Sequence, residues 1–170
     1  MEPNDGMTQV YRDMILWADI ILVATPIRWG NASSLYFKMA ERLNCVQNQI
    51  TMKDRVLVKN KVASFIITGG QDNIQQVAGQ MMVFFTDLGF TFPPFSFLGW
   101  SRGWTAEDMD KNILQFKKSE YVNRTAKELV DNCVNTLQSI KQMDVSKLKA
   151  PKPHKEDSLS FGMDNPDMNL

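Results

Sequence analysis

The sequence predicts one α/β domain in which helices cover both faces of a parallel sheet. Two apolar runs, at residues 20–24 and 62–67, lack polar alternation, as is typical of parallel strands buried on both faces. Around them lie segments whose apolar residues recur every three or four positions, the spacing of an amphipathic helix. Strands and helices that alternate in this way are joined by right-handed crossovers into a parallel sheet. A chain of 170 residues, 44% of them hydrophobic, is long enough for one such core.

The first part of the chain is predicted to form a helix, a strand and a second helix. Asp5 caps the first helix, and the strand at residues 20–24 has the character of a central strand, covered on both faces. Ser33 or Ser34 caps the second helix. The apolar positions of the first helix are Met7, Val10, Tyr11, Met14, Ile15 and Ala18, and those that the second helix turns inward are Leu35, Met39, Ala40 and Leu43.

Helical periodicity weakens over residues 46–61, so we expect a long irregular connection there. The segment also gathers basic residues, for which a solvated loop is the simplest interpretation and a partner surface is the alternative. These basic residues are Lys53, Arg55, Lys59 and Lys61.

The remaining elements repeat the pattern of strand and helix. The strand at residues 62–67 precedes a helix that Gly89 is placed to end. A third strand lies within residues 90–98, where two adjacent prolines reduce its first half to an edge or bulged segment. A short helical stretch opens at residues 105–108, and a long helix follows. The apolar positions of the two longer helices are Ile74, Val77, Ala78, Met81, Met82, Phe85 and Leu88, and then Val122, Ala126, Leu129, Val130, Cys133, Val134, Leu137 and Ile140.

The predicted element order is αβαβαβα, and the domain ends near residue 145. From residue 146 to residue 170, lysine, proline, aspartate and asparagine replace the apolar pattern, and such a composition buries too little surface to fold. The sequence therefore predicts one domain at residues 1–145 and a disordered C-terminal tail.

Composition narrows the classes of function. Nineteen Lys and Arg residues balance nineteen Asp and Glu residues, so no net field favours nucleic acid or an anionic membrane. Cys45 and Cys133 lie in separate predicted helices, and the single histidine is His154, so zinc sites, iron–sulfur clusters and Ser-His or Cys-His triads lack their residues. Unpaired cysteines, no signal peptide and no apolar run of about 18 residues predict a cytoplasmic protein without a membrane span.

Ligands of open parallel α/β sheets bind at the carboxyl ends of the strands, where this chain has three loops with unusual residues. The first loop combines a proline that sets its direction, two side-chain hydrogen-bond donors, a flat apolar wall and a glycine that permits close approach. It ends in serines at a helix N-terminus, which favours an electron-rich ligand edge. In the alternative interpretation the tryptophan packs in the core, the arginine is a solvated charge and the serines only cap the helix. The special residues of this loop are Pro26, Arg28, Asn31, Trp29 and Gly30.

The second loop runs from Thr68 to Asp72 and contains Gly69 and Gly70, where side chains would obstruct a planar ligand or where φ must be positive. A plain tight turn is the alternative. The third loop, residues 99–104, holds Trp100, Arg102 and Trp104, and we interpret it as a packed surface turn in preference to a ligand contact.

The segment ADIILVATPIRWGN at residues 18–31 resembles the AD-hydrophobic-TP-x-R-aromatic-GN stretch of the flavodoxin-fold NAD(P)H-dependent FMN reductases, including the WrbA-type quinone reductases. In that family this loop wraps the isoalloxazine ring, and the loop after the next strand closes over its other side. The resemblance extends through Gly89 and less clearly to Trp104. It implies a flavodoxin-like three-layer α/β/α fold and an FMN site formed by Thr25, Pro26, Ile27, Arg28, Trp29, Gly30, Asn31, Thr68, Gly69, Gly70 and Gln71.

The family's fold begins with a strand and a phosphate-binding loop, for which nothing before Asp19 is a counterpart. In the 2-1-3-4-5 strand order of that fold, the predicted strands match the third, fourth and fifth, so the strand at residues 20–24 lacks its central neighbour. We therefore expect an N-terminally truncated chain whose exposed strand edge invites pairing with another chain.

The resemblance implies an oxidoreductase that passes hydride from NAD(P)H to flavin N5 and then two electrons to a quinone or another small acceptor, which requires no protein nucleophile. Arg28, the backbone N–H groups of Gly69 and Gly70, and the helix end near Ser33 are expected to stabilise negative charge at N1 and the C2 carbonyl of reduced flavin. For residues 46–61, NADPH phosphate binding or a dimer contact then competes with a solvated loop. The complete protein is expected to be a homo-oligomer.

Two alternatives stay open. A half-domain that has lost FMN phosphate binding would be a non-catalytic interaction module. A flavodoxin-like one-electron carrier is the other alternative, but such carriers are usually acidic to meet basic partners, and this chain is neutral.

Overall fold

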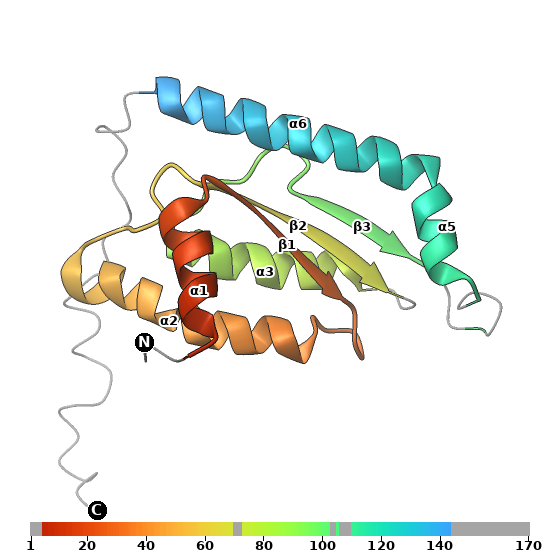
Figure 1. The fold of residues 1–170 in the computed structure, drawn as a ribbon, viewed down its shortest axis with the longest axis horizontal. Coiled ribbons are helices and arrows are strands. Elements are labelled where there is room, and N and C mark those ends of the chain that lie inside the picture. Colours follow the sequence, from red (N-terminus) through yellow and green to blue (C-terminus); the bar gives the residue numbers. More distant parts are fainter. Residues whose placement is uncertain (1–4, 70–72, 103–104, 106–109, 144–170) are drawn as a thin grey trace, which may run out of the picture.

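The computed structural model of the chain describes residues 5–69, 73–102, 105 and 110–143. Within these residues the sheet has three parallel strands in the order β1-β2-β3 (Figure 1). Ile20 pairs with Val62, and Phe65 pairs with Phe97, so the carboxyl ends of all strands lie at one edge of the sheet. The strands are β1 (Ile20–Pro26), β2 (Val62–Gly69) and β3 (Phe97–Ser101).

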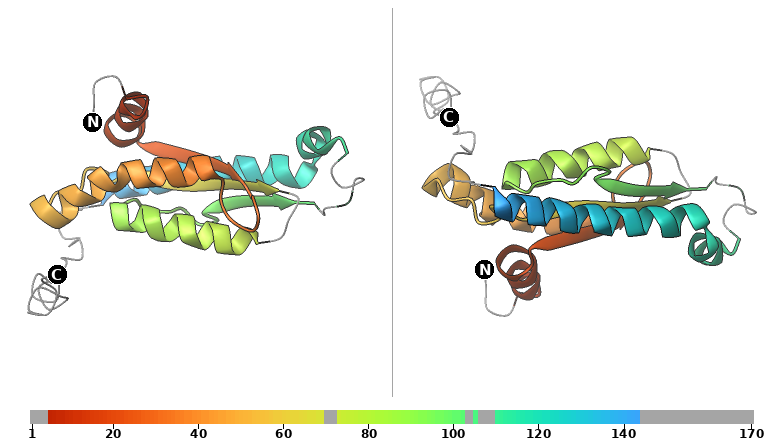
Figure 2. Two further views of the ribbon diagram at one scale, coloured as in Figure 1. Left: turned by 90° about the horizontal axis from the view of Figure 1, so that it is seen from below. Right: turned by 90° about the horizontal axis from the view of Figure 1, so that it is seen from above.

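Helices lie on both faces of the sheet, which confirms the predicted three-layer α/β/α architecture (Figure 2). α2 and α3 cover one face and α6 runs along the other, while α1 and η1 lie on the β1 side of the molecule. None of the described helices is long and apolar enough to cross a membrane. The tail predicted at residues 146–170 lies outside the described residues. The helices are α1 (Met7–Tyr11), η1 (Arg12–Trp17), α2 (Ser34–Lys53), α3 (Ile74–Leu88), α5 (Asn112–Lys118) and α6 (Glu120–Gln142).

Gly6 stands at the N-cap of α1 and makes no side-chain cap, while the predicted cap, Asp5, lies one residue earlier and its carboxylate accepts the backbone N–H of Met7 at 3.0 Å. After Tyr11 the helix widens into the π-helical turns of η1. Of the residues in these two elements, only Ile15 is buried. The partly buried Met7, Tyr11 and Met14 pack on the core beside Ile15, and Asp5 forms an ion pair with Arg42 of α2.

The first turn of α2 begins at a predicted cap but buries a different residue from the one that the apolar pattern predicted. Ser33 is the N-cap, since its hydroxyl accepts the N–H of Tyr36 at 3.3 Å, which confirms one of the two predicted caps. Leu35, expected to point inward, is 76% exposed, and Tyr36 is buried in its place. The cap geometry sets the helix phase, and this phase turns Leu35 towards solvent.

The C-terminal half of α2 corrects another prediction. The irregular connection expected over residues 46–61 begins only after Lys53, because Val46 is fully buried and continues the apolar stripe of Leu43. Asp54 then ends the helix in the left-handed conformation, at φ 52°. The shortened connection leaves only residues 54–61 between α2 and β2.

The segment from α3 to β3 confirms the predicted helix end, but the third strand lies at Phe97–Ser101 and so extends past the predicted residues 90–98 into the predicted third loop. Gly89 ends α3 at φ 97°, and a Cβ there would lie 2.5 Å from Val56 Cγ1, so only glycine fits. The two prolines delay the strand until Phe97, and before them Thr91 forms only an isolated bridge to β2. The first half of the predicted third strand is therefore a connection rather than a strand.

The main hydrophobic core lies between the sheet and the helices α2 and α3. Phe65 of β2 and Phe85 of α3 are fully buried there, and their ring centroids are 5.4 Å apart in an edge-to-face pair. On the opposite face α6 packs in two smaller clusters, one around Cys133 and one around Leu129. The two faces of the sheet are therefore covered unequally.

β1 is not buried on both faces, as the sequence predicted. Leu22 is 44% exposed, and burial alternates along the strand. The cause is topological, because β1 is the edge strand of the described sheet and α6 packs chiefly over β2 and β3. The described residues thus leave the exposed strand edge that the sequence analysis expected.

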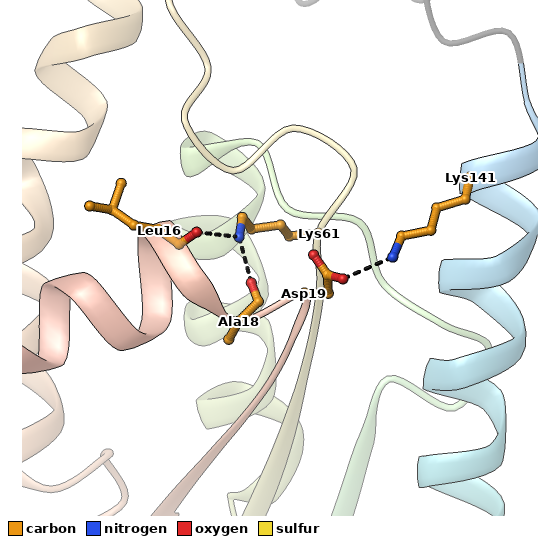
Figure 3. Close-up of polar contacts among 5 residues, drawn as sticks. All are labelled: Leu16, Ala18, Asp19, Lys61 and Lys141. Carbon is orange, nitrogen blue, oxygen red and sulfur yellow. Dashed lines mark hydrogen bonds and ion pairs between the residues drawn. The ribbon is translucent and has the colours of Figure 1, made fainter.

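Two lysines form polar contacts at the amino end of β1 (Figure 3). Lys61, only 9% exposed, donates from Nζ to the carbonyl oxygen of Ala18 at 2.5 Å and to that of Leu16 at 3.5 Å. Lys141 of α6 pairs with the Asp19 carboxylate at 2.8 Å. Lys61 is therefore not part of a solvated basic loop, since it satisfies carbonyl groups at the end of η1.

Candidate functional site

Backbone hydrogen bonds join the ends of all three strands at the carboxyl edge of the sheet. The N–H of Ile27 donates to the Thr68 carbonyl at 2.7 Å, and the N–H of Arg102 donates to the Gly69 carbonyl at 3.1 Å. The loop after β1 therefore lies against the end of β2, which in turn lies against the end of β3 (Figure 1). The candidate loops predicted from the sequence meet at one rim.

The loop after β1 turns sharply between Arg28 and Asn31. These residues exchange both backbone hydrogen bonds, at 2.7 and 3.0 Å, around Trp29 and Gly30, whose φ angles are 52° and 74°. Two consecutive positive φ angles are typical of a type I′ turn, in which glycine is favoured. Trp29 lies at the tip of this turn and is 87% exposed, so the alternative in which it packs in the core is wrong.

Two predicted site residues use their side chains inside the loop. Asn31 donates from Nδ2 to the Trp29 carbonyl at 3.1 Å. Thr25 is 2% exposed, and its hydroxyl oxygen accepts the N–H of Ser33 at 3.0 Å and lies 3.2 Å from the Ser33 hydroxyl. The buried Thr25 side chain thus connects the start of the loop to its end at Ser33.

Two positions of the rim require glycine because other segments of the same chain pass close to them. A Cβ on Gly69 would lie 2.9 Å from the Cβ of Ile27, and a Cβ on Gly30 would lie 3.0 Å from Nδ2 of Asn73. The same Nδ2 donates to the Gly30 carbonyl at 2.8 Å. The sequence suggested a close approach to a ligand at these glycines, and the structure shows a close approach between loops.

A cavity of about 340 Å³ opens at this rim, within the usual size range of small-molecule sites. Five predicted site residues line it, whereas Thr25, Trp29, Gly30 and Asn31 do not, and Gly70 and Gln71 lie outside the described residues. Arg28 is the only charged side chain among the described lining residues. The lining residues are Pro26, Ile27, Arg28, Thr68, Gly69, Trp100, Asn112, Ile113 and Phe116.

One wall of the cavity was missed by the sequence analysis. Trp100 of β3 packs edge-to-face on Phe116 of α5, with ring centroids 5.3 Å apart. The third loop was interpreted as a packed surface turn, and Trp100 lies instead in the cavity wall. The apolar spacing of Ile113 and Phe116 was an available signal for a helix here, but the short helix was expected at residues 105–108, most of which lie outside the described residues.

The charge of the cavity comes from Arg28 rather than from a titrating group beneath the loop. The backbone N–H of Tyr36 donates to the Ser33 hydroxyl, but Tyr36 does not line the cavity, and burial raises the pKa of its side chain to about 12. Its hydroxyl therefore stays protonated and neutral at physiological pH. The cavity is lined by one cation, Arg28, by the polar side chains of Thr68 and Asn112, and elsewhere mainly by apolar and aromatic residues.

A parallel sheet between two helical layers, with a mainly apolar cavity at its carboxyl edge, defines a flavodoxin-like α/β protein. Residues 1–105 match the model of the NADPH-dependent FMN reductases. The chain belongs to this family of flavin-dependent oxidoreductases, as the resemblance of residues 18–31 indicated.

Three similar proteins show how far the likeness extends. The chain is 30% identical over 83 residues to 8-demethyl-8-aminoriboflavin-5'-phosphate synthase of Streptomyces davaonensis, which is 49% of this chain and 32% of that protein. It is 27% identical over 97 residues to a protein of Mycobacterium bovis named divalent metal cation transporter MntH, which is 57% of this chain and 14% of that protein. The crystal structure of RosB with bound 8-demethyl-8-formylriboflavin-5'-phosphate has a TM-score of 0.70 and 21% identity, over 83% of this chain and 56% of that chain. The chain thus spans a third or less of the length of these curated relatives.

The residues of the cavity fit the ring of FMN, the cofactor in the family's name. Ile27, Trp100 and Phe116 offer apolar and aromatic walls, and Arg28 offers a cation. Oδ1 of Asn112 is a buried acceptor without a hydrogen-bond partner. A flat heteroaromatic ring with polar edges suits each of these features.

Proposed function

We propose that this cavity binds the isoalloxazine ring of FMN and that the chain is the flavin-binding part of an NAD(P)H-dependent oxidoreductase. The observation that supports it best is the meeting of the β1 and β2 loops, through Ile27 and Thr68, at an apolar cavity that contains Arg28. FMN, when bound, supplies hydride acceptance from NAD(P)H and the return of two electrons to a small acceptor such as a quinone.

Arg28 has the role of stabilising negative charge on the reduced ring. Arg28 lines the cavity, and no carboxylate of the described residues forms an ion pair with it. Backbone N–H donors of Gly69 and Gly70, together with Gln71, complete the polar edge in this proposal. The N-terminus of α2 contributes less than the sequence suggested, since the N–H groups of Ser33 and Tyr36 are already bonded within the cap.

The turn at residues 28–31 has the role of covering the ring. Its tip presents Trp29, which is 87% exposed and next in sequence to Arg28. Thr25 and Asn31 keep the turn in shape through their bonds to Ser33 and to the Trp29 carbonyl. Because these hydrogen bonds hold the turn in shape, it can cover one face of the ring and exclude water there without a side chain of the turn being buried in the core.

The test is the absorbance spectrum of the purified chain with and without added FMN, followed by a titration of flavin fluorescence. We expect a yellow complex that NAD(P)H bleaches. Arg28→Ala is expected to weaken FMN binding about tenfold or to shift the reduction potential of the flavin, because it removes a charge-assisted contact. Arg124→Ala is the matched control, since Arg124 lies on α6 and outside the cavity lining.

Two results would contradict this proposal. A colourless chain that does not change flavin fluorescence would overturn flavin binding. An unchanged titration and an unchanged potential in Arg28→Ala would overturn the role of Arg28 while leaving flavin binding in place.

The exposed edge of β1 favours a second candidate function. A non-catalytic half-domain would use this edge, with Leu22 44% exposed, to pair with another chain. In the flavin proposal the same edge is the contact of a cytoplasmic homo-oligomer. Sedimentation of the purified chain, combined with the flavin titration, distinguishes the two functions. A non-catalytic half-domain would associate without binding flavin, whereas the oxidoreductase would associate and bind flavin.

A further inference from the structure

Asn112 has an amide group that the fold does not use. It is the first residue of α5 and lines the cavity beside Trp100 and Phe116. Its Oδ1 is buried and accepts no hydrogen bond, and it is the only side-chain nitrogen or oxygen in that condition among the described residues. By contrast, Asn123 and Asn132 on α6 donate to backbone carbonyls, at 3.1 and 3.2 Å.

An unpartnered acceptor in apolar surroundings lowers the stability of the folded state. Among the residues that line the cavity with Asn112, Ile113 and Phe116 have no side-chain donor, and neither the indole N–H of Trp100 nor any other donor bonds to its Oδ1. Rotation about χ2 of asparagine is soft, so the amide can present its oxygen to the cavity at small cost. A ligand that brings an N–H group to this wall would supply the missing bond.

The chemistry of the missing bond distinguishes between classes of ligand. The pyrimidine edge of a flavin carries an imide N–H between two carbonyls, and a nicotinamide ring carries a carboxamide N–H. A quinone has only acceptors at its polar edges. Since Oδ1 can only accept and Nδ2 can only donate, an amide or imide edge satisfies Asn112 and a quinone edge does not.

We propose that Asn112 is a specificity-determining residue of the cavity, whose amide oxygen accepts a hydrogen bond from the N–H of a planar ring that bears an amide or imide. The inference depends on the proposed function, because it takes this cavity to be the site of a flavin or nicotinamide ring. The flavin imide is the expected donor, since Arg28, assigned above to the anionic edge of the flavin, lines the same cavity.

The flavin arm compares FMN with its N3-methyl derivative, which lacks the imide N–H. Titrations of flavin fluorescence are measured for the wild-type chain, for Asn112→Leu and for Gln115→Leu. The wild type is expected to prefer FMN over the methylated ring about threefold to tenfold, which is the range for one neutral hydrogen bond. Asn112→Leu removes that preference, and Gln115→Leu, which replaces an exposed amide on the same helix, retains it.

The nicotinamide arm uses NADPH and its 3-acetylpyridine analogue, which has a carbonyl but no amide N–H. Binding is followed by the fluorescence of the reduced nicotinamide with the same variants. If Asn112→Leu removes the preference for NADPH and keeps the preference for FMN, the donor is the carboxamide, and the acceptor role of Asn112 stands.

A structural role of Asn112 predicts different results. Because Asn112→Leu deletes an unpartnered buried polar group and keeps the size of the side chain, the melting temperature of the unliganded chain is expected to stay the same or rise. A lower melting temperature together with equally weakened binding of both flavins would overturn the proposal. Preferences unchanged in both arms would also overturn it. A wild-type chain that binds neither ring would overturn the proposed function itself, and this inference with it.

Discussion

The two faces of the sheet differ in how completely they bury the apolar surface of the chain. On the face of α2 and α3, one continuous core surrounds Phe65 and Phe85, both fully buried. On the face of α6, Val130 and Val134 are 45% and 39% exposed, and Leu22 of β1 is 44% exposed. The first face therefore supplies most of the hydrophobic stabilisation, and the second keeps apolar surface free.

Val134, one of the exposed residues of α6, lies on the side of the helix that is turned to β1. Val134 and Lys141 lie seven positions apart on α6, which places them on one side of the helix, and Lys141 reaches Asp19 at the start of β1. The side of α6 that carries Val134 is therefore the side turned to β1. Mutations on the first face are therefore expected to lower the free energy of unfolding, and mutations on the second are expected to change the self-association of the chain.

The largest effect is expected on the α2 and α3 face. Phe65→Ala should lower the free energy of unfolding by about 3–5 kcal/mol, because the ring is fully buried and packs on Phe85 and Phe92. Urea unfolding followed by circular dichroism measures it. Phe95→Ala is the control, because Phe95 is 75% exposed and its loss should change stability by less than about 0.5 kcal/mol. Equal losses would remove the distinction between core and surface.

A pair of leucines compares the two faces directly. Leu43 of α2 and Leu129 of α6 are 0% and 1% exposed, and either substitution by alanine should cost about 2–5 kcal/mol. Leu43→Ala is expected near the upper limit, since the large core around it cannot collapse into the cavity. Leu129→Ala is expected near the lower limit, since α6 packs in small clusters that can relax. A larger loss at Leu129 in the same unfolding assay would reverse the ranking of the faces.

An intermediate effect is expected at the amino end of β1. Lys61→Met keeps most of the side chain volume and removes the bonds from Nζ to the carbonyls of Leu16 and Ala18. The buried carbonyls lose a charged donor, so the free energy of unfolding should fall by about 1–3 kcal/mol. Lys59→Met is the control, because Lys59 is exposed. If both variants unfold at the same urea concentration, Lys61 contributes no more than a surface lysine.

The exposed edge is expected to govern association with little effect on stability. Leu22→Lys should change the free energy of unfolding by less than about 0.5 kcal/mol, because its side chain is already partly in water. It should weaken any self-association of the chain, since charged residues on an edge strand oppose pairing. Sedimentation velocity at several concentrations measures this. The control is Ile21→Lys, which lies on the opposite, buried face of the strand and should instead unfold the domain. If Leu22→Lys folds and associates as strongly as the wild type, the edge of β1 is not the surface through which the chains associate.

The smallest effect is expected from the pair of Asp19 and Lys141 and depends on pH. The hydrogen bond from Lys141 lowers the pKa of Asp19 below its usual 3.8, so the ionised form is favoured in the folded state. Its contribution is present above the unfolded-state pKa and is lost as the pH falls through the lower folded-state pKa. Because both side chains are more than half exposed, the contribution should not exceed about 0.5 kcal/mol. Asp19→Asn should remove this acid-dependent part of the unfolding free energy and leave the rest of the pH profile unchanged.

Local patterns in the sequence determined the fold class and the position of the site. Unbroken apolar runs predicted β1 and β2, and the capping residues Ser33 and Gly89 predicted helix ends that the structure confirms. The resemblance of residues 18–31 predicted the family that the match over residues 1–105 shows. These features depend on the neighbours of each residue along the chain, so the sequence contains them.

Only the tertiary structure decided which surfaces are covered and what closes the site. The apolar run of β1 predicted burial on both faces, but Leu22 is 44% exposed because α6 packs chiefly over β2 and β3. Likewise, Asn112 and Phe116 lie one turn apart on α5, but they form a cavity wall with Trp100 only because β3 and α5 meet there. The role of Gly69 is a contact with Ile27 across two loops for the same reason. The sequence determined the chemistry of the first two loops, and long-range packing determined the cavity to which they belong.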